Sequence, residues 1–123
     1  GPARLSSRLL DVLADFSAVL VVTHDNPDPD AIAAGWALHW MIETRLSVSV
    51  RLIGSGGIVR AENREMVRLL NVPLELVDHL APMVKGRLLI FFPGSFENNN
   101  YRLLDGYDGW NYLAVPITAD KVF

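Results

Sequence analysis

The order of apolar and polar positions along the chain predicts helices that alternate with strands. Over residues 3–15, apolar residues recur at intervals of three and four, which is the spacing of an amphipathic helix. A β-branched run follows over residues 19–22, and this composition suits a buried parallel strand. The same reasoning predicts further helices over residues 31–45 and 60–70, and further strands over residues 47–53, 73–77 and 87–92.

The last third of the chain has a different pattern. Two apolar runs, residues 101–104 and 110–117, flank a short glycine-containing stretch, and this arrangement predicts two antiparallel strands joined in a hairpin. The alternation before it favours a parallel sheet covered by helices on both faces. The sequence therefore predicts one α/β domain, a Rossmann-like three-layer sandwich whose mostly parallel sheet is completed by a C-terminal β-hairpin. Residues 3–84 form its βαβα segment and residues 85–123 its β-rich segment.

Composition narrows the class of protein. The chain has 123 residues, which is enough for one domain with a single core. Half of the residues are hydrophobic and the mean hydropathy is +0.24, so we expect extensive burial that includes an interface in a homo-oligomer. The net charge is −3 and no basic stripe is present, which argues against nucleic-acid binding through phosphate charge.

Several classes of protein are excluded or disfavoured by what the sequence lacks. It contains no cysteine, so disulfides and thiolate metal sites are excluded. No apolar run is long enough to span a bilayer and no secretory signal is visible, so we expect a cytoplasmic protein without a membrane partner. Gly1 and Pro2 read as the remainder of a cleaved tag and are left out of the fold prediction.

The junction between the first strand and the following helix carries the most chemistry. The strand delivers His24 to the carboxyl edge of the sheet, where open α/β sheets usually bind ligands. Two prolines stiffen the turn, so Asp28 and Asp30 lie two apart in a near-extended segment and can converge with His24 on one point. An imidazole and two carboxylates suit Mn²⁺ or Mg²⁺ before Zn²⁺.

A second interpretation of this junction needs no metal. Asp30 would be the N-cap of the helix, a role worth about 1 kcal/mol. Asp25 and Asp28 would be solvated turn residues, and His24 would form a hydrogen bond at the strand end. The small residues that open the helix favour a close approach to the sheet, and this context supports the metal interpretation without excluding the other.

The stretch from Thr23 to Gly35 resembles the first motif of the DHH phosphoesterases, whose pattern is close to H-x-x-P-D-x-D-A-I. The matching residues are His24, Pro27, Asp28, Asp30, Ala31 and Ile32. The later stretch GSGGIVRAENREMVRLLNVPL resembles the second βα unit of bacterial members, so the resemblance covers about residues 4–84. It implies a Rossmann-like domain that holds two Mn²⁺ ions for phosphoester hydrolysis. It also implies that His24, Asp28 and Asp30 are metal ligands, with Mn²⁺ or Mg²⁺ as the cofactor.

The chain departs from that family after the first motif. The family needs an acid at the end of a later strand and an Asp-His-His cluster, but here the corresponding strand ends in Phe92-Pro93-Gly94 and no such cluster exists. Two-metal hydrolysis requires both ions, about 3.5–4 Å apart. We therefore assign no catalytic residue and expect that turnover is lost while part of the metal site remains.

The C-terminal segment carries a different resemblance. Residues 85–118 resemble the end of a protein of unknown biochemistry from BREX phage-defence clusters. Together the two resemblances predict a chimeric or truncated DHH-like domain without turnover, in a homo-oligomer with or without exchanged segments. The alternative is an Mn²⁺-dependent phosphoesterase that hydrolyses small phosphodiesters or short oligonucleotides, with further ligands from Asp105, Asp108 or a second subunit. A third hypothesis is a non-catalytic module that binds one divalent ion.

Overall fold

The structure, a computed structural model, describes residues 11, 18–46, 48–79, 88–93, 101–104 and 111–115, without the side chains of residues 88–93, 104 and 111–115. The strands are β1 (Ala18–Val22), β2 (Ser49–Gly54), β3 (Leu74–Leu76), β4 (Leu88–Pro93) and β5 (Asn111–Val115). The helices are α2 (Pro29–Arg45), α3 (Ala61–Leu69) and the 3₁₀ turn η1 (Arg102–Leu104). Apart from residue 11, the predicted helix over residues 3–15 lies outside the described residues.

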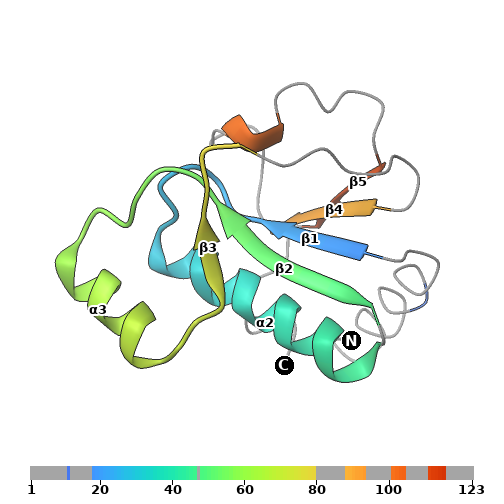
Figure 1. Cartoon of the computed structure of the whole chain (residues 1–123), viewed down its shortest axis with the longest axis horizontal. Coiled ribbons are helices and arrows are strands. Elements are labelled where there is room, and N and C mark those ends of the chain that lie inside the picture. The colour runs from blue at the N-terminus through green and yellow to red at the C-terminus, as the bar shows by residue number, and fades with distance from the viewer. Residues whose placement is uncertain are drawn as a thin grey trace.

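The strands form a parallel sheet in the order β3-β2-β1-β4-β5 (Figure 1). β1 lies in the middle, where Val21 is in register with Leu52 of β2 on one side and with Phe91 of β4 on the other. The crossovers through α2 and α3 both move toward the β3 edge, and right-handed crossovers in one direction put both helices on one face of the sheet. The predicted α/β, Rossmann-like parallel sheet is confirmed.

The predicted C-terminal hairpin is wrong. Residues 102–104 form the turn η1 and not a strand, and β5 pairs with β4 in parallel, with Phe91 in register with Leu113. The apolar run over 101–104 has another use, because Tyr101 and Leu103 are buried and the backbone N–H of Arg102 donates to a carboxylate of the turn after β1. Tertiary contacts at the carboxyl edge therefore replace the local strand pairing that the pattern predicted.

The central strand is buried on both faces, as the predicted layered fold requires. Val19 and Val21 pack against Leu38 and Ile42 of α2 in the main core cluster. Leu20 and Val22 alternate with them along the strand and are equally buried. A parallel strand in this position reads as a continuous apolar run and not as an alternating one, which explains the sequence of β1.

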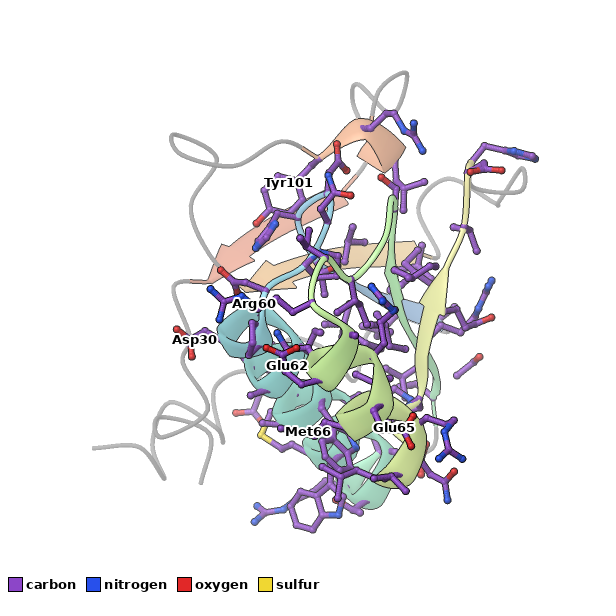
Figure 2. The ribbon with its side chains drawn as sticks, turned by 90° about the vertical axis from the view of Figure 1, so that its left-hand side faces the viewer. Asp30, Arg60, Glu62, Glu65, Met66 and Tyr101 are labelled. Atoms are coloured by element: carbon purple, nitrogen blue, oxygen red, sulfur yellow. The ribbon has the colours of Figure 1, made fainter. Side chains whose placement is uncertain are left out.

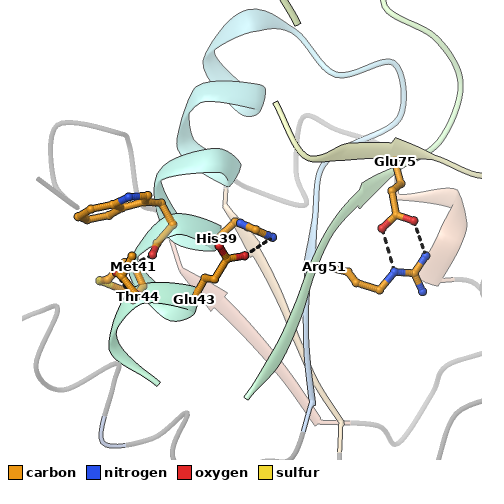
Figure 3. Close-up of polar contacts among 7 residues, drawn as sticks. His39, Met41, Glu43, Thr44, Arg51 and Glu75 are labelled. Atoms are coloured by element: carbon orange, nitrogen blue, oxygen red, sulfur yellow. Dashed lines mark hydrogen bonds and ion pairs between the residues drawn. The ribbon is translucent and has the colours of Figure 1, made fainter. Parts of the chain in front are cut away.

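The small residues of α2 bring this helix close to the sheet, as predicted. Ala31, Ala34 and Gly35 are buried, and a Cβ added at Gly35 would lie 2.6 Å from Cδ1 of Leu52. Ala33, another of the small residues predicted to approach the sheet, is exposed. On the flank of α2, buried His39 places Nε2 at 3.6 Å from Oε2 of Glu43, one turn later (Figure 3).

A second close approach lies at the end of β2, and it yields a stability prediction. A Cβ at Gly54 would overlap the hydroxyl of Thr23, which is itself buried, whereas a Cβ at Gly57 would meet no atom within 4 Å. Gly54→Ala should lower the free energy of unfolding by about 1–3 kcal/mol, the usual cost of overpacking. Gly57→Ala is the matched control and should leave the urea midpoint nearly unchanged. Equal midpoints for the two variants would contradict the packing described here.

A bidentate ion pair between Arg51 and Glu75 links the edge strand β3 to β2. Nε and Nη2 of Arg51 donate to the two carboxylate oxygens of Glu75 at 2.9 and 3.0 Å (Figure 3). The hydrogen bonds from Arg51 hold the pKa of the Glu75 carboxyl below its ordinary value of 4.5. Both side chains are nearly half exposed, so the pair is worth at most about 1 kcal/mol.

The lowered pKa of Glu75 gives the sign of a pH effect. A depressed carboxyl pKa stabilises the fold above the unfolded-state pKa, and this contribution is lost as pH falls through the folded-state pKa. Wild type should therefore be more stable than Glu75→Gln at neutral pH by up to about 1 kcal/mol, and the difference should shrink below pH 4.5. Urea unfolding of both proteins across this range measures it. A difference that grows on acidification would contradict the assignment.

Candidate metal centre

The turn after β1 is held against the end of β2 by backbone hydrogen bonds. The N–H groups of Thr23 and Asn26 donate to the carbonyls of Ile53 and Ser55, both at 2.8 Å. Asn26 adopts a positive φ of 51°, a conformation that asparagine tolerates, and its side-chain oxygen accepts from the N–H of Gly57 at 3.0 Å. The loop after β2 is thereby fixed beside the turn that carries the predicted metal ligands.

The N-cap of α2 is Asp28 and not Asp30, so the prediction of the cap is wrong. Asp28 has an extended backbone and its Oδ1 accepts from the N–H of Ala31 at 2.8 Å. Pro29 then takes the first helical position, where its fixed φ suits the helix and its missing N–H costs nothing. The helix therefore begins two residues earlier than predicted, and Asp30 lies within its first turn.

His24 and Asp28 come together at the carboxyl edge of the sheet. Nε2 of His24 lies 3.7 Å from Oδ2 of Asp28, the carboxylate oxygen that does not cap the helix. Nδ1 of His24 lies 2.8 Å from the carbonyl oxygen of Asp25. A carbonyl can only accept, so Nδ1 carries the hydrogen of this bond, and Nε2 is the ring nitrogen that faces Asp28.

Asp30, the third predicted ligand, does not join this pair. It is exposed, and its side chain projects from the first turn of α2 away from the body of the domain (Figure 2). Among the residues that the structure describes, no group of three histidine or acidic side chains lies close enough to hold one ion. Asp105 and Asp108, which were considered as further ligands, lie outside the described residues.

Sequence analysis missed the structural role of Asp25, which it treated as a solvated turn residue. Its Oδ1 accepts from the hydroxyl of Ser55 at 2.7 Å and from the backbone N–H of Arg102 at 3.0 Å, so it links three segments. The contact with Ser55 could have been anticipated, because both residues follow parallel neighbouring strands. No sequence signal points to Arg102. Tyr101 precedes Arg102 in the chain, and burial raises the pKa of its phenol.

A small cleft adjoins the pair on the side of α3. It has a volume of about 130 Å³ and lies between the proline-containing turn and the start of α3. Arg60 and Asn63 contribute polar groups to its wall (Figure 2 labels Arg60). Arg64 fixes this wall, because its Nη1 donates to the carbonyls of Ile58 and Val59 at 2.7 and 3.1 Å. The cleft therefore places Asp28 beside the polar side chains of Arg60 and Asn63.

These features define an α/β protein with a Rossmann-like parallel sheet and a histidine–aspartate pair at its carboxyl edge. Over 62 residues, the chain is 40% identical to the uncharacterized protein MJ1633 of Methanocaldococcus jannaschii. The matched region is 50% of this chain and spans only 13% of that protein. No protein-family profile matches the chain. No solved structure matches it either. Within the described part of the chain, no helix is both long and apolar enough to cross a membrane.

The role of Asp25 can be tested by removing its carboxylate. Asp25→Ala leaves the N–H of Arg102 and the hydroxyl of Ser55 without their acceptor, so we expect a loss of about 1–3 kcal/mol in the free energy of unfolding. Trypsin should also cut faster after Arg102, because η1 loses an attachment to the turn. Ser55→Ala removes only one of these bonds and should leave the cleavage rate near that of wild type. Unchanged trypsin cleavage in Asp25→Ala would contradict this role.

Proposed function

We propose that these 123 residues form a DHH-like α/β domain that binds one divalent cation, Mn²⁺ or Mg²⁺, through His24 and Asp28, and that they do not turn over phosphoesters. The observation that carries the proposal is the 3.7 Å separation between Nε2 of His24 and Oδ2 of Asp28. Ligand bonds of roughly 2.0–2.2 Å on each side of an ion fit within that separation. When bound, such an ion would polarise an oxygen of a phosphate ligand or of water.

The surroundings of the pair support binding of a cation. The hydrogen bond from Nδ1 of His24 to the carbonyl of Asp25 orients the ring and leaves Nε2 as the ligand atom, which is the usual outer-shell arrangement of metal-binding histidines. The cap bond orients the Asp28 carboxylate in the same way. Only 13% of the His24 side chain is exposed, whereas 61% of the Asp28 side chain is, so an ion could enter from the carboxylate side.

The proposal of no turnover rests on the ligands that a second ion would need. β4 neighbours β1, so its carboxyl end is where the bridging acid of a two-ion site would lie. That end reads Phe91, Phe92, Pro93 and offers no carboxylate. The domain would thus be a binding module, whether its two segments share one origin or form a chimera.

A thermal-unfolding experiment with Mn²⁺ tests cation binding. The melting temperature of wild type should rise with ion concentration, by the equivalent of about 1.4 kcal/mol at ten times Kd. Asp28→Asn should abolish this rise but keep the apo stability, because asparagine caps a helix as well as aspartate does. Asp78→Asn removes a 97% exposed carboxylate elsewhere and is the matched control, which should respond as wild type does. Asp30→Asn measures whether the third predicted ligand takes part.

Two results would overturn the proposal. Equal Mn²⁺ responses in wild type and Asp28→Asn would mean that His24 and Asp28 form only an ion pair or a hydrogen-bonded turn. Mn²⁺-dependent release of nitrophenol from a chromogenic phosphodiester, lost in Asp28→Asn, would instead establish the alternative phosphoesterase activity. We expect no release above the buffer blank.

A further inference from the structure

The turn η1 is packed at the carboxyl edge of the sheet although it carries no metal ligand. It lies beyond the carboxyl ends of β1 and β2 (Figure 1). Residues 101–104 read Tyr-Arg-Leu-Leu, so they offer neither a carboxylate nor an imidazole. Tyr101 and Leu103 are only 7% and 4% exposed. Between them, the backbone N–H of Arg102 lies 3.0 Å from Oδ1 and 3.2 Å from Oδ2 of Asp25, so it contacts both oxygens of one carboxylate.

Asp25 connects this turn to the candidate metal ligand His24. The carbonyl of Asp25 accepts from Nδ1 of His24 at 2.8 Å, whereas its carboxylate accepts from Arg102 and from the hydroxyl of Ser55. The N–H of the same peptide group, which belongs to Asn26, donates to the carbonyl of Ser55 at 2.8 Å. The peptide group that orients the His24 ring is therefore held by the loop after β2 and, through the Asp25 side chain, by η1.

A site with two protein ligands depends strongly on the orientation of each. His24 and Asp28 supply one nitrogen and one oxygen, so a displaced imidazole would remove half of the protein ligands. Outer-shell groups keep metal-binding histidines in the right orientation, and their loss typically costs roughly 10–100-fold in metal affinity. The Asp28 carboxylate is oriented separately by its cap bond to the N–H of Ala31. Of the two ligands, His24 is therefore the one whose position depends on the attachment of η1.

We propose that η1 is a positioning element of the metal site, in which the N–H of Arg102 holds Asp25 and thereby keeps Nε2 of His24 in place for a divalent cation. This inference rests on the proposed function. Coupling between two sites is reciprocal, so a bound cation should in turn hold η1 at the edge of the sheet. The C-terminal part of the chain thus raises the affinity of the metal site without supplying a ligand to it.

Two substitutions at Arg102 isolate the contribution of its N–H. Proline lacks this N–H and its fixed φ suits the first residue of a 3₁₀ turn, so Arg102→Pro removes the hydrogen bond to Asp25 together with the guanidinium. Arg102→Ala removes the same guanidinium, which lies 3.9 Å from Asp78, but keeps the N–H. The electron paramagnetic resonance signal of free Mn²⁺ gives the Kd of each variant. The Kd of Arg102→Pro should be at least about fivefold higher than that of Arg102→Ala. A merely structural attachment would lower the melting temperature and leave the Kd unchanged.

Trypsin cleavage of wild type tests the coupling in the reverse direction and needs no substitution in η1. Saturating Mn²⁺ should slow cleavage after Arg102 at least about fivefold relative to cleavage after Arg68. Arg68 is an exposed residue of α3 that pairs with Glu65, and it is the reference because general stabilisation by a ligand would slow both cleavages alike. In Asp28→Asn, which should not bind Mn²⁺, the ratio of the two rates should not respond to the ion.

The outcomes separate this inference from the proposed function. Equal Kd values for the two Arg102 variants overturn the inference and leave the metal site standing. So does a cleavage ratio that wild type keeps unchanged in saturating Mn²⁺, and this ratio alone decides if Arg102→Pro does not fold. A wild type that does not bind Mn²⁺ at all overturns the proposed function, and this inference fails with it.

Discussion

The structure depends on one residue that fastens the carboxyl edge of the sheet. The Asp25 carboxylate accepts hydrogen bonds from Ser55, after β2, and from the backbone of Arg102, about 77 positions further along the chain. The carbonyl of the same residue accepts from His24 and sets the orientation of its ring. A partly buried acceptor of this kind is costly to leave unpaired, so the positions of the turn, the β2 loop and η1 are coupled. The geometry of the candidate metal site follows from this coupling.

Asp28 shows how a cap and a ligand position can share one carboxylate. One oxygen accepts a hydrogen bond from the backbone N–H of Ala31, which has no partner within the helix, and the other oxygen faces His24. Because Pro29 starts the helix immediately afterwards, the chain turns before Asp30 and carries that side chain outward. The sequence motif predicts three ligands that converge from an extended segment. In the structure only His24 and Asp28 face each other, and Asp30 lies apart from them. The helix boundary, which local capping chemistry decides, sets how many groups can reach one point.

Two surfaces with different chemistry meet at the start of α2. The cleft beside Asp28 is partly polar, the α2–α3 groove is apolar, and Pro29 lines both. Helix α2, which contributes to both linings, is packed onto β1 and β2 through Leu38, Ile42 and Leu52. The other wall belongs to α3, which Arg64 ties to its preceding loop but which contributes nothing to the core.

The sequence by itself determined the elements whose burial pattern is local. The parallel sheet is predicted by the β-branched run of β1, the small residues of α2 and the alternation of strands with helices. These patterns are visible because positions that are buried at a regular interval are apolar at the same interval in the sequence. Only the tertiary structure decided the fate of residues 101–104 and the contact between Asp25 and Arg102, whereas the cap of α2 is a local choice between Asp28 and Asp30. The apolar run over 101–104 reads equally well as a strand or as a buried turn, and its partner at Asp25 is remote in sequence. The Arg102 partner of Asp25 is set by which segments meet at the sheet edge, and no local pattern in the sequence indicates that meeting.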